Sequence, residues 1–163
     1  MNKNFKFLIF AIGFSFFTSV FAKASTVNLW ERAYSASNCV YFSTNLADFH
    51  FEYQNTSLPW GSRVFLVYGF YDSFSKQSMQ GYDKVELRAS QPYTWTVQLN
   101  NLTIAERSSF TRTKIQFYFR IVLPNQQILV DKGSPNDYYY SSDILPTSCQ
   151  KGSFQKVTYW TSF

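Results

Sequence analysis

The sequence predicts an all-β protein built from two packed antiparallel sheets, a sandwich of about seven or eight strands. Apolar residues recur at every second position in a succession of short segments, and Gly, Pro, Asn and Ser residues separate these segments. No segment has the apolar period of a helix. A small closed barrel would have the same pattern of strands and turns, so it remains the alternative architecture.

The first half of the chain contains two well-marked strand patterns. In residues 46–54, Phe49, Phe51 and Tyr53 alternate with polar residues, which is typical of a strand with one buried face. Residues 63–71 are apolar on both faces and therefore predict a central strand. Weaker patterns cover residues 27–34 and 83–89.

The second half continues the same alternation. Residues 93–99 place Tyr93 and Trp95 on the same face as the two apolar residues that follow at the same spacing. Residues 115–121 form the next strand, and the Pro124-Asn125 turn returns the chain into a strand that begins at Ile128, so a hairpin is expected. A final strand is expected over residues 154–160.

The N-terminal segment has the three parts of a signal peptide. Two lysines precede an apolar run over residues 7–20, and small residues stand where cleavage after Ala22 or Ala24 would occur. The run is shorter than the roughly 20 residues that span a membrane. We therefore expect residues 1–22 to be removed and residues 23–163 to form a single soluble domain that is secreted or periplasmic, without membrane insertion.

Cys39 and Cys149 are the two cysteines of the chain. In an oxidising compartment an even number of cysteines predicts a disulfide. Such a bridge would close almost the whole domain, for which the chain-entropy model gives about 4.7 kcal/mol of stabilisation. Two buried free thiols are the alternative.

Composition argues against catalysis and against nucleic-acid binding. His50 is the single histidine, and no known nucleophile, phosphate or zinc motif occurs. The spacing of Asp131, Asp137 and Asp143 matches no calcium loop. The formal net charge of +5 is small for a dedicated nucleic-acid binder. We expect no enzyme activity, no cofactor, no metal site and no nucleic-acid partner.

One predicted strand presents a row of charges on its outward face. The row consists of Arg112, Lys114, Gln116, Tyr118 and Arg120. Such a row can bind phosphates or an acidic glycan, but it more often keeps a sheet soluble and its edges from pairing.

Aromatic residues in turn-like segments are the candidate ligand-binding residues. Trp60 lies within a Pro/Gly turn, and Tyr138, Tyr139 and Tyr140 follow a loop. A strand buries every second residue, so at least one ring of the triplet is expected to face solvent. Exposed Tyr and Trp rings are common platforms for sugars and for protein contacts.

Two motifs resemble the immunoglobulin-like, starch-binding type of carbohydrate-binding module. They are Val67-Tyr68-Gly69-Phe70-Tyr71-Asp72, and Val130-Asp131-Lys132-Gly133 followed by Asp137-Tyr138. The family's first stacking Trp has Phe74 near its place, and Val130-Asp131-Lys132 replaces the motif that holds the second. The resemblance thus implies an immunoglobulin-like sandwich and a carbohydrate ligand, without the family's stacking tryptophans.

Together these observations predict an exported, non-catalytic binding module whose partner is polysaccharide or a cell-surface glycan. The alternative is a structural or adhesive protein of the cell surface or periplasm that docks another protein, for instance through a sheet edge.

Overall fold

The computed structural model describes residues 24–35, 45–72, 76–78, 82–104, 113–133, 137–142 and 152–162. The expected leader, both cysteines, Arg112 and Asp143 lie outside these residues. The disulfide and the signal peptide therefore stay predictions. In the part of the chain that is described, no helix has the length and apolar character needed to cross a membrane.

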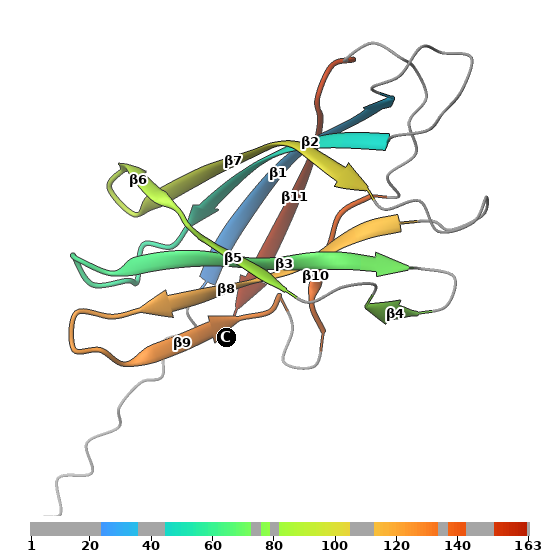
Figure 1. Ribbon diagram of the computed structural model, residues 1–163. Helices are drawn as coiled ribbons and strands as arrows, with labels where there is room; N and C mark the ends of the chain where they lie inside the picture. The colour runs from blue at the N-terminus through green and yellow to red at the C-terminus, as the bar shows by residue number, and fades with distance from the viewer. Residues whose placement is uncertain are drawn as a thin grey trace, which may run out of the picture.

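The described residues form two antiparallel sheets packed face to face, as predicted (Figure 1). The first sheet has the order β11 (Gln155–Ser162), β1 (Ala24–Ser35), β2 (Asn45–Gln54), β7 (Thr94–Ile104) and β6 (Arg88–Gln91). The second has the order β10 (Tyr139–Tyr140), β8 (Thr113–Val122), β3 (Arg63–Asp72) and β4 (Gln77–Ser78), with β5 (Asp83–Glu86) beside β3 and β9 (Ile128–Asp131) beside β8.

The strand order is that of an immunoglobulin-like sandwich. The series β1-β2-β7-β6 in one sheet, facing β3-β8-β9 in the other, follows the ABED and CFG arrangement of that fold. The last strand, β11, adds to the first sheet beside β1. The order excludes the up-and-down pairing of a simple closed barrel.

The described residues form eleven strands where seven or eight were expected, because the outer strands of the second sheet are divided. Both β4 and β5 pair with the same edge of β3, and both β9 and β10 pair with the same strand, β8. The predicted strand at residues 83–89 is also two strands. Figure 1 shows β5 continuing into β6 as the chain passes from the second sheet to the first. Leu87 lies at this crossing, buried, and its N–H donates to the Val64 carbonyl at 2.8 Å.

Large aromatic rings fill the space between the sheets. The predicted inward residues of β2 and β8 meet there, with ring centroids 5.0 Å apart for Phe51 and Phe117 and 4.6 Å apart for Tyr53 and Phe119. All four side chains are fully buried. Each such burial stabilises the fold by roughly 1.5–3 kcal/mol, so the alternation in the sequence decides which face of each strand is inside.

Tyr93 departs from the predicted pattern. Its ring is 48% exposed and its φ is +60°, because it occupies the turn between β6 and β7 and precedes the strand. The inward face of β7 therefore begins at Trp95.

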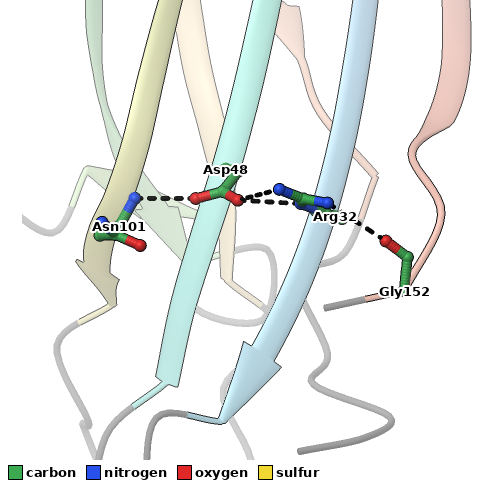
Figure 2. A network of polar contacts seen from close by, with 4 residues as sticks. All are labelled: Arg32, Asp48, Asn101 and Gly152. Atoms are coloured by element: carbon green, nitrogen blue, oxygen red, sulfur yellow. Dashed lines mark hydrogen bonds and ion pairs between the residues drawn. The ribbon is translucent and has the colours of Figure 1, made fainter. Parts of the chain in front are cut away.

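A partly buried ion pair holds the edge of the first sheet at which β1 and β7 end (Figure 2). The register between β2 and β7 shifts at Asp48, which forms a bulge. The Asp48 carboxylate accepts from Arg32 of β1, with an N–O distance of 2.7 Å, and from the N–H of Asn101 in β7 at 2.8 Å. Arg32 also reaches the carbonyl of Gly152, just before β11. One carboxylate thus joins three neighbouring strands.

Candidate functional site

The outer face of the second sheet carries the charged row predicted for β8. Gln116, Tyr118 and Arg120 alternate with residues that are fully or almost fully buried in the core, so they lie on the solvent side of the sheet. The neighbouring strands add more aromatic residues to this face.

Three tyrosines meet above β8, and we refer to Tyr82, Tyr118 and Tyr138 as the tyrosine cluster. Their ring centroids lie 5.8–6.3 Å apart, and the rings of Tyr82 and Tyr138 are nearly parallel. The ammonium of Lys132 lies 4.8 Å from the Tyr138 centroid and 6.0 Å from that of Tyr118, within the range of cation–π attraction. The cluster is a partly exposed aromatic surface with a cation at its edge.

A single amide fixes the cluster to its neighbours. Gln116 is buried beneath the rings and accepts a hydrogen bond from the hydroxyl of Tyr82. Its Nε2 donates to the hydroxyl of Tyr140 at 2.9 Å. The Tyr140 ring packs in turn against Tyr71, with centroids 5.0 Å apart. Burial raises the pKa of Tyr140, so this phenol keeps its proton at neutral pH.

The middle tyrosine of the predicted triplet is a core residue. Tyr139 is 3% exposed, and its ring lies parallel to that of Phe117 with centroids 5.2 Å apart. Its hydroxyl donates to Oδ1 of Asp131 at 2.8 Å. Burial, and then the charge of Asp131, raise the pKa of Tyr139. The triplet therefore presents Tyr138 and Tyr140 outward and uses Tyr139 as an anchor.

Asp131 is the centre of that anchor. Its carboxylate is fully buried and accepts four hydrogen bonds, from the hydroxyls of Ser25, Tyr53 and Tyr139 and from the N–H of Gly133. The donors come from β1, β2, β10 and the segment after β9. Lys132, the next residue, faces the opposite way and reaches the tyrosine cluster. The core thus holds the chain under the cluster.

Gly133 allows this segment to turn. Its φ is +82°, and a Cβ at this position would lie 2.8 Å from Cε1 of Tyr139. Any other residue would be strained and would push against the anchoring ring. The glycine at the end of the Val130-Asp131-Lys132-Gly133 motif is therefore required by the geometry of this turn.

A pocket of about 440 Å³ opens beside the cluster, at the edge where β10 and β11 approach each other. Tyr138, Tyr140 and Trp160 are among the residues that line it. Trp160 is 77% exposed, although the alternation of the last strand gave no sign of a binding role.

Trp60 lies apart from the tyrosine triplet. It is 90% exposed in the turn between β2 and β3, where β3 begins at Arg63 opposite Val122. Tyr139 pairs with Phe117, which lies five residues before Val122 in β8. At about 3.3 Å per residue, the two parts of the predicted platform are separated by roughly 16 Å along β8. The structure does not bring them together.

The sequence analysis missed Tyr82 and Trp160, and treated Tyr118 as part of a charged row. Tyr82 belongs to no strong alternating segment, and its contact with Tyr118 depends on β5 lying next to β3. The available signal was the abundance of aromatic residues, which make up 21% of the chain.

His50 lies on the outer face of the first sheet, as its alternation predicted. Its ring stacks on Trp30 with centroids 4.9 Å apart. Among the residues that the structure describes, no three His, Cys, Asp or Glu side chains gather as a metal site would require.

Comparison of this chain with protein-family models, with curated proteins and with solved structures finds no match. The geometry of the tyrosine cluster and the charges around it are therefore the observations that bear on function.

Proposed function

We propose that this chain is a non-catalytic binding module that holds polysaccharide on the tyrosine cluster. The observation that supports the proposal is the contact of three outward-facing phenol rings on one sheet face, with Lys132 beside them. The strand order is that of the immunoglobulin-like fold, but a fold alone does not choose a ligand.

Sugar rings suit this surface for a physical reason. One face of a pyranose consists of C–H groups with a slight positive charge, and an aromatic ring carries negative charge on its face. The hydroxyls at the edge of the sugar remain free for polar groups such as the Tyr140 phenol. A shallow surface of this kind buries little area, so weak binding is expected.

The proposed setting is the periplasm or the exterior of the cell, after removal of residues 1–22. A Cys39–Cys149 bridge would then tie the start of the domain to its end. Both points depend on residues outside the described part of the chain and are tested by intact mass and by alkylation without reduction.

Affinity electrophoresis of the full chain in gels containing neutral and charged polysaccharides tests the proposal. Tyr118→Ala and Tyr138→Ala should each weaken retention about fivefold, because a ring contact is worth about 1 kcal/mol. Tyr93→Ala is the matched control, since it removes an exposed ring from the β6–β7 turn. Trp60→Ala measures separately whether the distant tryptophan contributes.

Retention of no polysaccharide by the wild type would contradict the proposal. Equal retention of the two cluster variants and of Tyr93→Ala would also contradict it. Loss of retention in Trp60→Ala alone would move the site to the β2–β3 turn.

A second candidate function, docking of another protein, is favoured by one edge of the first sheet. The strand β6 pairs with β7 only as far as Thr96. From Val97 to Ile104, no described strand covers the outer edge of β7. An extended peptide could add to such an edge. Replacing Gln98 with Pro would block that addition, and an unchanged set of bound proteins in cross-linking experiments would contradict it.

A further inference from the structure

The tyrosine cluster is surrounded by positive charge. Lys132 lies 6.0 Å from the Tyr118 ring, and Arg120 is the next outward residue on the same strand, about 7 Å along it. Lys84 pairs with Val67, which in turn pairs with Tyr118, so Lys84 lies about two strand spacings away, roughly 10 Å. Three cations therefore flank one ring, one from β5, one from β8 and one from the residue that follows β9.

Of the carboxylates near the cluster, Glu86 is engaged by a cation, whereas Asp83 and Asp137 are exposed next to Tyr82 and Tyr138 in the chain. Within the described ranges the two ion pairs are Arg32 with Asp48 and Arg63 with Glu86, and neither includes these three cations. Glu86 receives two hydrogen bonds of 2.6 Å from Arg63, which lowers the pKa of its carboxyl. Asp137 is exposed and accepts from the N–H of Tyr138.

We infer that the ligand of the tyrosine cluster is an acidic polysaccharide whose sugar carboxylate is bound beside Tyr118 by Lys132 and Arg120. This inference rests on the proposed function and names its substrate class. The sugar face contacts the Tyr118 and Tyr138 rings, and the carboxylate receives charge-assisted hydrogen bonds from the cations. Lys84 adds attraction at longer range.

A single-stranded nucleic acid also combines rings with negative charge. Proteins that bind it have a basic groove that follows the backbone over several nucleotides. Here the cations surround a single ring, and the formal net charge of the whole chain is only +5. The arrangement suits isolated carboxylates spaced along a sugar chain better than a continuous phosphate backbone.

The experiment compares polysaccharides with the same sugar backbone, one carrying carboxylates and the other neutral. The full chain is run in gels containing polygalacturonate or its fully methyl-esterified form, and in gels containing carboxymethyl cellulose or hydroxyethyl cellulose. We expect stronger retention by the acidic member of at least one pair. That retention should fall as the salt concentration rises from 0.01 to 1 M, because the Debye length shortens from about 30 to about 3 Å.

Lys132→Gln and Arg120→Gln should each weaken retention by the acidic polysaccharide about fivefold and leave retention by the neutral one unchanged. Lys156→Gln is the matched control. It makes the same change in net charge on the outer face of the first sheet, where the Lys156 ammonium lies over Trp30. Circular dichroism establishes that each variant is folded.

Each other outcome overturns the inference. Equal retention by both members of every pair overturns it while the proposed function stands. Retention by no polysaccharide overturns the inference and the proposed function together. Equal losses in Lys132→Gln and Lys156→Gln would show that only net charge matters. Tighter binding of an oligothymidylate or of polyglutamate than of polygalacturonate would assign the site to a different polyanion.

Discussion

Two buried carboxylates, Asp48 and Asp131, are stabilised in different ways in the two halves of this sandwich. Both are fully buried. Asp48 forms an ion pair with Arg32 and accepts the backbone N–H of Asn101. Asp131 has no ion pair among the described residues and is held by three hydroxyls and one N–H.

The two carboxylates should respond differently when one of their partners, or the carboxylate itself, is replaced. A hydroxyl can rotate and accept a hydrogen bond when its acceptor is replaced, whereas a guanidinium can only donate. Removing either charge at the Asp48 site therefore removes the attraction that offsets the burial of the other charge. The Asp131 site tolerates a neutral replacement better, and the next residue in the chain is Lys132, whose ammonium reaches the tyrosine cluster.

The largest expected effect is on the ion pair. Arg32→Ala leaves the buried Asp48 carboxylate without its cation and should lower the free energy of unfolding by about 3 kcal/mol. Urea unfolding followed by circular dichroism measures the loss. Arg63→Ala breaks an exposed pair and should leave the unfolding midpoint unchanged. Similar losses in the two variants would contradict the importance of burial.

Asp131→Asn should cost less, about 2 kcal/mol, because the amide keeps one acceptor oxygen and the hydroxyls can reorient. Urea unfolding followed by circular dichroism again measures the loss. Polysaccharide retention should also fall, since Lys132 and Gly133 follow this residue. A loss of stability equal to that of Arg32→Ala would remove the distinction between the two sites.

Tyr139→Phe removes one of the four donors to Asp131 and should cost about 1.5 kcal/mol. The buried ring stays in place, so retention on polysaccharide should remain that of the wild type. A lower affinity with unchanged stability would show that the Tyr139 hydroxyl contacts the ligand.

The smallest expected effect depends on pH. Burial raises the pKa of Glu31 above its unfolded value, against the opposing hydrogen bonds from Ser142 and the charge of Lys114. The folded state therefore holds this proton more tightly. Its contribution to stability is complete below the unfolded pKa of about 4.3 and is lost as the pH rises through the folded pKa.

Glu31→Gln removes that titration. The stability of the wild type relative to this variant should fall slightly as the pH increases from 4 to 7, measured by thermal unfolding across this range. A difference between the two proteins that stays constant with pH would contradict the raised pKa.

The local pattern of the strands could be predicted because it depends on neighbouring residues. Phe49, Phe51 and Tyr53 alternate with polar residues, and that period of two selects the buried face wherever β2 lies. The β8–β9 hairpin follows from Pro124-Asn125 in the same way. Tyr93 was misplaced because a turn residue can continue the alternation of the strand that it precedes.

The site could be predicted only in part. Tyr138 and Tyr140 were named, and the outward row of β8 was identified, but the two were treated as separate surfaces. Trp60 was joined to the tyrosines on composition alone, although the register separates them. Whether the protein is exported and whether its cysteines pair remain predictions from the sequence.

The sequence by itself determined that this protein is a set of antiparallel strands with aromatic residues on their inner faces, because burial of every second side chain is a local property of a strand. Only the tertiary structure decided that β5 lies beside β3 and that β10 lies beside β8. Those pairings bring Tyr82, Tyr118 and Tyr138 together. Such contacts join residues distant in the chain, and strand pairing across a sandwich depends on the packing of the whole core, which no local pattern contains.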